Sequence, residues 1–339
     1  LLAAVTAAGL ASSPPAVADW RSASPGYGWE FPRDDGVHPA YKTEWWYLTG
    51  HLFPVEGGTD EAFSFQMTFF RVGLIPAAQP LPASEWAARD LVMAHASVAD
   101  PGNGDHRFSE VLRRAAPLLG GFGGPTDTTL AWCRAPAGTE GTWSITRTKR
   151  GYRLQAADDR RGFRYDLTCV PSKPRVFHGE GGFSPKSAGG TAGSLYFSYT
   201  RMTVTGSVTI GDRTVAVRGQ SWLDREIFSS TLAADQTGWD WVSLQLDDGR
   251  DLMLYRLRGK DESAGFALGT LVDSKGNSST LSQDTWTLEP LETWTSPETD
   301  AEYPVLWSLR IPGLELDLVL EATHPAQENV SGGSGVHYW

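Results

Sequence analysis

Hydrophobic and polar residues alternate along most of this chain, and a period of two residues is typical of β-strands. Clear examples are the runs 43–52, 63–72 and 91–100. Turns that contain Gly and Asp, at 211–212 and 248–249, separate neighbouring runs and favour β-hairpins. A helix-like pattern is present only at 82–90 and 106–116. We therefore predict an all-β fold of antiparallel strands with a few short helices.

The length of the chain favours two domains over one. An eight-stranded antiparallel barrel needs roughly 100 to 170 residues at strand lengths of about five to ten, whereas this chain has 339. We therefore expect two β-barrel-like domains. The break is expected in FSSTLAADQTG at 228–238, because the residues there are mostly small or polar.

The run TEWWYLTGHL at 43–52 concentrates aromatic and polar side chains. Read as a strand, it places Trp45, Tyr47 and His51 on one face, and Glu44 and Trp46 on the other. The first face is an aromatic wall whose members also carry hydrogen-bonding atoms, which suits a cavity for a bulky apolar ligand. The alternative is that the two tryptophans only fill the barrel. The pattern does not decide which face points inward.

Four further runs carry candidate site residues. The candidates are Met93 and His95 in LVMAHASV, His178 in FHGEGGFSPK, Tyr199 and Arg201 on one face of SLYFSYTRM, and Trp239 and Trp241 in GWDW. Each has a plainer alternative, namely a core histidine for LVMAHASV, a surface turn for FHGEGGFSPK and core packing for the other two. The run FHGEGGFSPK is similar to an esterase oxyanion loop, but no G-x-S-x-G nucleophile motif accompanies it.

The run SWLDREIFSS at 221–230 carries the strongest candidate for chemistry. As a strand it places Trp222, Asp224 and Glu226 on one face. Two neighbouring carboxyl groups shift each other's proton affinity, and such a pair can keep one carboxyl protonated as a general acid. His95 is the third candidate catalytic residue. The alternative is a strand end held by salt bridges, with Arg225 paired to an acid elsewhere.

Charge and composition exclude several functions. The net charge of −11 argues against a nucleic-acid partner, because phosphate binding needs clustered Lys and Arg. No His or Cys spacing indicates a zinc site, so we predict no metal. Two cysteines, Cys133 and Cys169, either form a disulfide or remain buried thiols.

The beginning of the chain indicates export. Residues 1–18 are apolar and small and end in Ala16-Val17-Ala18, as in a signal peptide with its cleavage site. The apolar run is too short to span a bilayer. We therefore expect a periplasmic or extracellular protein that does not span the membrane, and the missing Met suggests that this end is trimmed.

The runs quoted above, in their order along the chain, resemble the AttH/CrtC family of lipocalin-like proteins. The resemblance covers residues 28–230 most closely and implies one lipocalin-like domain there and a second at 231–339. The final GVHYW is similar to the start of the closing strand of that domain, so the chain also looks cut at this end. In the hydratases of the family, the Asp that matches Asp224 is the proton donor, but Arg225 and Glu226 depart from their pattern and favour the AttH branch.

The resemblance implies an exported AttH-type protein that binds a hydrophobic small molecule such as a polyene or lipid. Two hypotheses remain open. The first is a cofactor-independent enzyme that hydrates, hydrolyses or isomerises the ligand by carboxylate acid–base chemistry. The second is a lipocalin-like carrier or an accessory of an ABC-type transport system, which binds without reacting.

Overall fold

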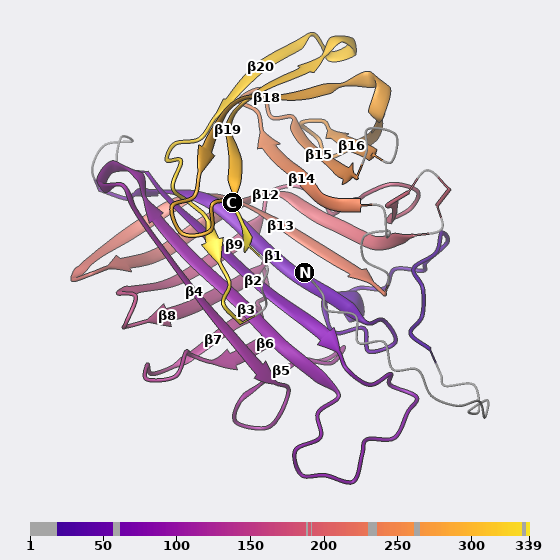
Figure 1. Cartoon of the computed structure of the whole chain (residues 1–339), viewed down its shortest axis with the longest axis vertical. Helices are drawn as coiled ribbons and strands as arrows, with labels where there is room; N and C mark the ends of the chain where they lie inside the picture. The colour runs from indigo at the N-terminus through magenta and orange to yellow at the C-terminus, as the bar shows by residue number, and fades with distance from the viewer. Residues whose placement is uncertain are drawn as a thin grey trace.

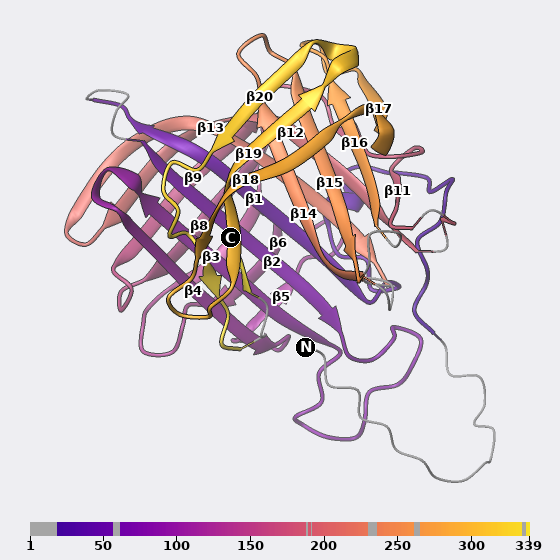
Figure 2. The ribbon, with the colours of Figure 1, turned by 45° about the horizontal axis from the view of Figure 1, so that its top comes forward.

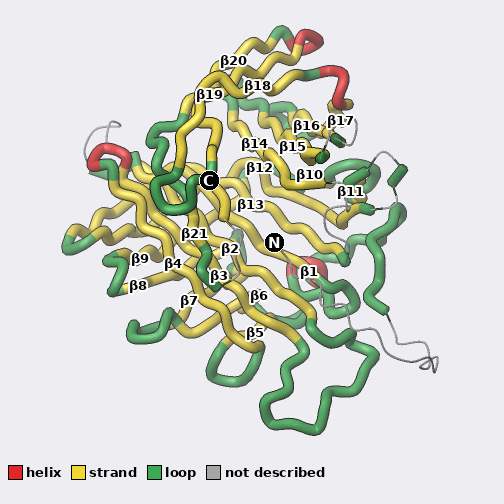
Figure 3. Tube along the Cα trace, viewed as in Figure 1, coloured by secondary structure: helices red, strands yellow, loops and turns green. Residues whose placement is uncertain are grey.

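A computed structural model describes residues 19–56, 62–187, 189–190, 192–229, 236–260, 265–333 and 337–339. The all-β prediction is confirmed, since strands fill most of the described chain (Figure 3). The helices there are single 3-10 turns: η1 (Arg33–Asp35), η2 (Pro101–Asn103), η4 (Gln283–Thr285) and η5 (Pro312–Leu314). None of these turns has the length or the apolar character of a membrane-crossing helix.

One large antiparallel sheet forms the first half of the protein. Its path runs through β4 (Asp105–Arg114), β3 (Asp90–Asp100), β2 (Phe63–Gly73), β1 (Thr43–Pro54), β13 (Arg213–Phe228), β12 (Gly193–Ile210), β9 (Phe163–Pro171), β8 (Tyr152–Asp158), β7 (Thr142–Arg147), β6 (Thr129–Arg134) and β5 (Gly120–Phe122). The short strands β10 (Val176–Phe177) and β11 (Phe183–Pro185) also pair with β12. The sheet curls until β4 meets β6, and this gives a nearly closed barrel (Figure 1).

The second half forms two smaller sheets. One contains β14 (Gln236–Gln245), β15 (Asp251–Gly259), β16 (Phe266–Val272) and β17 (Ser278–Ser282), and the other contains β18 (Thr287–Thr295), β19 (Glu302–Ile311) and β20 (Leu316–Glu321). Their shared core includes Leu252, Leu254, Trp286 and Leu309. Figure 2 shows the β14–β17 sheet lying against β12 and β13. The expected linker residues 230–235 lie outside the described part of the chain.

The end of the chain returns to the first half. Strands β21 (Asn329–Val330) and β22 (His337–Tyr338) pair with each other. The Tyr338 hydroxyl lies 2.9 Å from Nδ1 of His95, which is on β3. Residues assigned by sequence to the second domain therefore cover the outside of the first barrel.

The two predicted helices are wrong. Residues 82–90 form turns and the first residue of β3, and 106–116 form most of β4. Strand β4 pairs with β3 from Asp100↔Asp105 to Leu91↔Arg114. Over so short a run, the apolar residues of β4 fit both the helical period and the strand period. The edge of β3 offers backbone hydrogen bonds, and these favour the strand.

The inside of the barrel is packed with side chains. Strand β1 alternates regularly, and Trp46, Leu48 and Leu52 point into the core. They meet residues from around the sheet, among them Phe65, Phe69, Trp143, Ile145, Leu154, Tyr165, Leu167 and Phe197. Trp46 therefore fills the barrel, as the plainer alternative has it, whereas Trp45, to which that alternative also applied, faces outward.

A buried charge network closes one end of this core. Both Glu44 and Arg225 point inward and form an ion pair, and Arg71 Nη1 lies 3.1 Å from the Glu44 carboxylate. The backbone amide of His38 donates to the same carboxylate at 2.9 Å. The Arg225 guanidinium also lies 3.8 Å from the centre of the Trp46 ring. Burial alone would raise the pKa of Glu44, but Arg225, His38 and Arg71 hold it well below its usual range.

We predict that Glu44→Gln destabilises the fold by about 3 kcal/mol, because two buried guanidinium groups lose their counter-charge. Denaturant unfolding at pH 7 measures the change. The control is Asp166→Asn, which removes a more exposed carboxylate 2.5 Å from Arg153 and should cost less than about 1 kcal/mol. Equal effects of the two substitutions would contradict a structural role for the buried network.

Candidate functional site

The outer face of β13 and its two neighbours carries the candidate site. Strand register places Asp224 directly between Tyr47 on β1 and Ser198 on β12. Trp241 on β14 covers this position from the second half, with ring centroids 5.5 Å from Tyr47 and 6.4 Å from Trp222. Asp224 is 4% exposed. The predicted acid therefore lies between the barrel and the β14–β17 sheet.

Two side chains donate hydrogen bonds to one oxygen of Asp224. The Ser198 hydroxyl and the Trp222 indole NH, the latter at 2.6 Å, both reach Oδ1. Tyr196 is a further hydrogen-bond partner. Burial raises the pKa of Asp224 to about 7, and the charge of Glu226 acts in the same direction, while the three hydrogen bonds oppose it. A carboxyl group with this pKa is about half protonated at neutral pH, where an ordinary aspartate is ionised, and the protonated form is the one that a general acid requires.

A buried histidine extends the hydrogen-bond chain behind Asp224. His178 Nε2 lies 2.7 Å from the Ser198 hydroxyl, and Nδ1 lies 2.9 Å from the Thr270 hydroxyl on β16. Burial, helped by the charge of Lys186, lowers the pKa of His178 to about 3, so the ring is neutral. Because Ser198 donates to Asp224, its oxygen is free to accept from Nε2–H, and Nδ1 then accepts from Thr270.

His178 is buried, so it does not belong to an exposed turn. The following Gly179 has φ +70°, and a Cβ there would meet the Phe183 carbonyl oxygen at 2.1 Å. The Gly-rich run therefore folds tightly back on β11. This fold sets the imidazole between the two halves of the protein.

The second carboxylate has a cationic partner. Glu226 lies 2.7 Å from Nζ of Lys186 and accepts a hydrogen bond from Ser194. The ammonium group also lies 4.3 Å from the centre of the Tyr255 ring. Burial would lower the pKa of Lys186, but Glu226 and Tyr255 outweigh it and raise that pKa. The two acids on this face therefore differ, since Asp224 has hydroxyl and indole partners and Glu226 has a buried cation.

Partly exposed aromatic side chains surround these acids. Tyr47 and Trp241 are half-buried, and Trp239, two residues from Trp241 on the same face of β14, is 52% exposed. Trp45 packs against Phe228, with ring centroids 4.9 Å apart. Aromatic rings from both halves of the protein therefore lie near the two acids.

Several predicted site residues lie elsewhere. Glu44 and Trp46 belong to the barrel interior, and His51 is exposed beyond the aromatic group. Tyr199 also points inward, with its ring 6.1 Å from that of Tyr152. The expectation that Arg201 shares its face is wrong, because a register shift between Tyr199 and Met202 reverses the alternation. Arg201 forms an ion pair with Asp251 of the second half at 2.7 Å.

His95 and Met93 lie on the outer face of the barrel but away from Asp224. Register joins Asp224, Tyr47, Thr68 and His95 in one row across four strands, which separates the end members by roughly 14 Å. The His95 ring stacks on Tyr338, and burial lowers its pKa to about 4. Its surroundings are those of a core histidine under the C-terminal segment.

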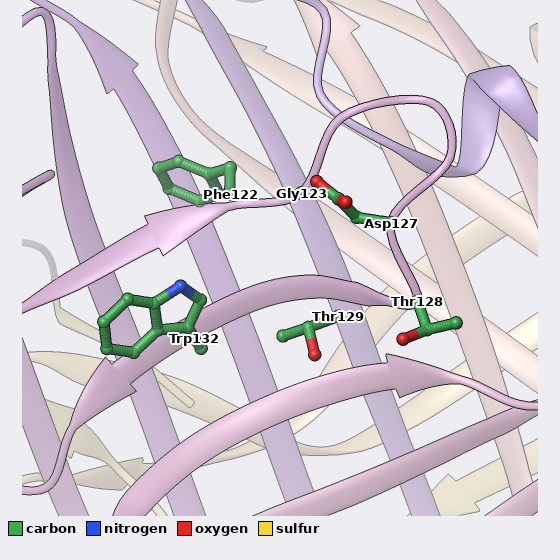
Figure 4. Close-up of a pocket in the computed structure, with 6 residues that line it drawn as sticks. All are labelled: Phe122, Gly123, Asp127, Thr128, Thr129 and Trp132. Carbon is green, nitrogen blue, oxygen red and sulfur yellow. The ribbon is translucent and has the colours of Figure 1, made fainter. Parts of the chain in front are cut away.

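Two cavities in the described chain lie apart from the predicted residues. One of about 230 Å³ is lined by Phe122, Gly123, Asp127, Thr128, Thr129 and Trp132 (Figure 4). The other, about 640 Å³, is lined by Arg256, Leu257, Arg258, Gly259, Lys260, Gly265, Phe266, Ala267 and Gln283. Neither of these two cavities includes Asp224 or a predicted ligand-binding residue.

The two cysteines do not contribute to the site. Cys133 and Cys169 are both free and buried inside the barrel, so the alternative of two thiols holds. Burial raises the pKa of each thiol to about 12. Within the described ranges, no three or more His, Cys, Asp or Glu side chains come together as a metal site.

Sequence reasoning missed four residues that shape the site. Ser198 and Tyr196 alternate with Tyr199 in a run that was read for its other face, and Lys186 ends the quoted FHGEGGFSPK run. The alternation of hydroxyl residues along the strand could have pointed to Tyr196 and Ser198, and the position of Lys186 in a quoted run could have pointed to that lysine. Thr270 lies in the unremarkable run FALGTLV, and no local signal marks it.

Comparison with known proteins identifies the family and structures of similar fold. The AttH-like family model matches residues 22–339. The crystal structure of a candidate AttH from Nitrosomonas europaea has a TM-score of 0.80 and 31% identity, covering 94% of this chain and 92% of that one. Kievitone hydratase from Nectria haematococca shares the fold, with a TM-score of 0.64, 15% identity and coverage of 94% and 87%. No curated protein sequence matches the chain. The chain belongs to the AttH-like family.

Proposed function

We propose that this protein is a cofactor-independent enzyme in which Asp224 protonates a bulky hydrophobic small molecule, and that hydration of a carbon–carbon double bond is the reaction. The observation that carries the proposal is a buried carboxyl group, with a pKa raised to about 7, among tryptophan and tyrosine rings. A carboxyl group whose pKa lies near neutral pH still holds a proton there and can deliver it as a general acid.

The proposed reaction has two steps. The Asp224 proton forms a C–H bond with one alkene carbon at the expense of the π bond, and the other carbon becomes a cation. A water oxygen then bonds to the cationic carbon, and one proton of that water returns to the Asp224 carboxylate. The sum is alkene plus water giving an alcohol, and the acid is regenerated.

Neighbouring residues have defined tasks in this scheme. The faces of Trp222, Trp241 and Tyr47 stabilise the developing cation by about 0.5 to 2 kcal/mol per contact. Ser198 and Trp222 hold Oδ1 by donating to it, which leaves the acidic proton to Oδ2. Glu226, held by Lys186, is the candidate to orient the water.

Two observations support the proposed ligand class, namely the partly exposed aromatic side chains near Asp224 and the similarity in fold to a hydratase. A rim that includes Trp45, Trp239 and Trp241 favours a planar or polyene-like apolar molecule over a sugar or nucleotide. A protein that shares the fold is named for hydration of kievitone, although 15% identity extends the likeness to the fold alone.

Export is a further part of the proposal. Its support is the signal-peptide pattern of residues 1–18, which lie outside the described part of the chain. A link to an ABC-type transport system rests on the resemblance to the AttH branch.

The carrier hypothesis differs from the enzyme in one measurable outcome. The protein is incubated with a bacterial lipid and carotenoid extract, and the bound and free fractions are analysed by mass spectrometry. An enzyme yields a compound that has gained one water. A carrier returns its ligand unchanged.

We predict that Asp224→Asn reduces turnover of the compound found in that screen by a factor of about 100 or more, because the amide cannot donate an acidic proton. Ligand binding, measured by quenching of tryptophan fluorescence, should change little. Asp166→Asn is the matched control on the exposed surface and should retain full activity. Loss of binding and turnover together in Asp224→Asn would count against the catalytic role.

We also predict that activity falls as pH rises above about 7, because Asp224 must be protonated to act and its pKa is about 7. Ser198→Ala removes a hydrogen bond that favours the ionised carboxylate, so the pKa should rise. The alkaline limb of the pH–rate profile should then move to higher pH. A limb that stays in place would show that another group controls it.

A further inference from the structure

One loop at the end of the barrel is apolar and yet exposed. Residues 74–88, LIPAAQPLPASEWAA, connect β2 to β3 and contain a single charged side chain, Glu85. Leu74, Leu81 and Trp86 of this loop are all exposed, and Trp86 most of all at 76%. Exposed loops are ordinarily polar, so an apolar one of this length indicates a contact surface.

The loop has a defined shape. The Arg89 guanidinium donates to the carbonyl oxygens of Pro76 at 2.6 Å and Gln79 at 3.1 Å, which ties the loop to the start of β3. Arg114, at the end of β4, donates to the Trp86 carbonyl at 2.5 Å and lies 4.9 Å from the centre of its ring. The apolar side chains are therefore held outward.

Another exposed apolar residue lies at the same end of the sheet. Leu118 lies in the turn after β4, is 78% exposed and has φ +70°. This backbone region is costly for a leucine and natural for glycine. An exposed leucine in a strained turn adds little to stability, so its presence fits a role in contact. Figure 3 shows the two loops in green at the lower end of the barrel.

Arginines lie near both loops. Arg113 and Arg114 end β4 just before the turn of Leu118, and Arg114 also lies over the Trp86 ring. The neighbouring acids are Glu85 in the loop and Asp90 at the start of β3, and Asp90 is paired with Arg71. The backbone amide of Arg134 donates to the Leu119 carbonyl at 2.9 Å, which places it next to Leu118. This cationic end stands out on a chain of net charge −11.

We propose that this end of the barrel docks on the surface of a bilayer that contains anionic phospholipid. Trp86, Leu81 and Leu118 enter the boundary between headgroups and acyl chains, a position that tryptophan favours. Arg113, Arg114 and Arg134 contact the lipid phosphates. Arginines beside apolar side chains favour an anionic lipid surface over an apolar protein partner. Docking of this kind would let an apolar ligand pass from the membrane to the protein without crossing water.

Vesicle co-sedimentation of the full chain tests the proposal and does not depend on the proposed reaction. The probe is a vesicle of phosphatidylcholine with about 30% phosphatidylglycerol. We expect Trp86→Ser with Leu118→Gly to reduce partitioning about tenfold or more, and Arg113→Gln with Arg134→Gln to remove the preference for phosphatidylglycerol. Each variant retains residues 1–18, so any contribution from that segment is common to all.

The matched control is Leu291→Ser with Val319→Ser. These side chains are 52% and 65% exposed and belong to the β18–β20 sheet, at the opposite end of the molecule in Figure 1. Partitioning of the control should equal that of the unchanged chain. Thermal melting checks folding, and Leu118→Gly should not lower stability because it relieves the positive φ. Absence of vesicle binding by the unchanged chain, or equal losses in control and test variants, would overturn the proposal. So would self-association that the Trp86 and Leu118 substitutions abolish.

Discussion

The antiparallel pairing of β1 with β13 is the constraint on which the rest of the structure depends. It sets Trp46 opposite Arg225 and Tyr47 opposite Asp224. Since side chains alternate along a strand, one pair must point into the barrel and the other must point out. A slip of one residue would move the arginine to the site and the acid into the core. The same register therefore determines both the buried ion pair and the candidate acid.

Glu44 on β1 and Asp224 on β13 are both buried, but their pKa values shift in opposite directions. Glu44 on the inside is fully buried, but two guanidinium groups and a histidine compensate its charge, and its pKa falls. Asp224 on the outside is also buried, but its partners are hydroxyl and indole groups, and its pKa rises. Water exclusion is common to both, so the presence of a cation decides between a structural carboxylate and a protonated acid.

The sequence allowed the faces of the two central strands to be predicted, because their alternation is regular and both strands are long. Trp222, Asp224 and Glu226 do share a face. It did not allow the inward face of β1 to be chosen, since Trp46 and Trp45 are equally apolar. Which of them is enclosed depends on the direction in which the sheet curls, and Trp46 lies on the enclosed side.

Other features depend on contacts that no local pattern carries. The register shift after Tyr199 sends Arg201 to Asp251, and a one-residue irregularity has no hydrophobic signature. The hydrogen-bond chain from Asp224 through Ser198 and His178 to Thr270 joins three strands, β13, β12 and β16, and the loop after β10. The C-terminal cover over His95 likewise arises from tertiary packing.

The protonation of Asp224 can be measured without any knowledge of the ligand. Infrared spectra recorded across a pH titration, with Asp224→Asn subtracted, report the carboxyl C=O stretch of this residue alone. The account predicts that the protonated band persists at pH 6 and disappears with a midpoint near pH 7. A midpoint near pH 4, the ordinary value for an aspartate, would contradict it.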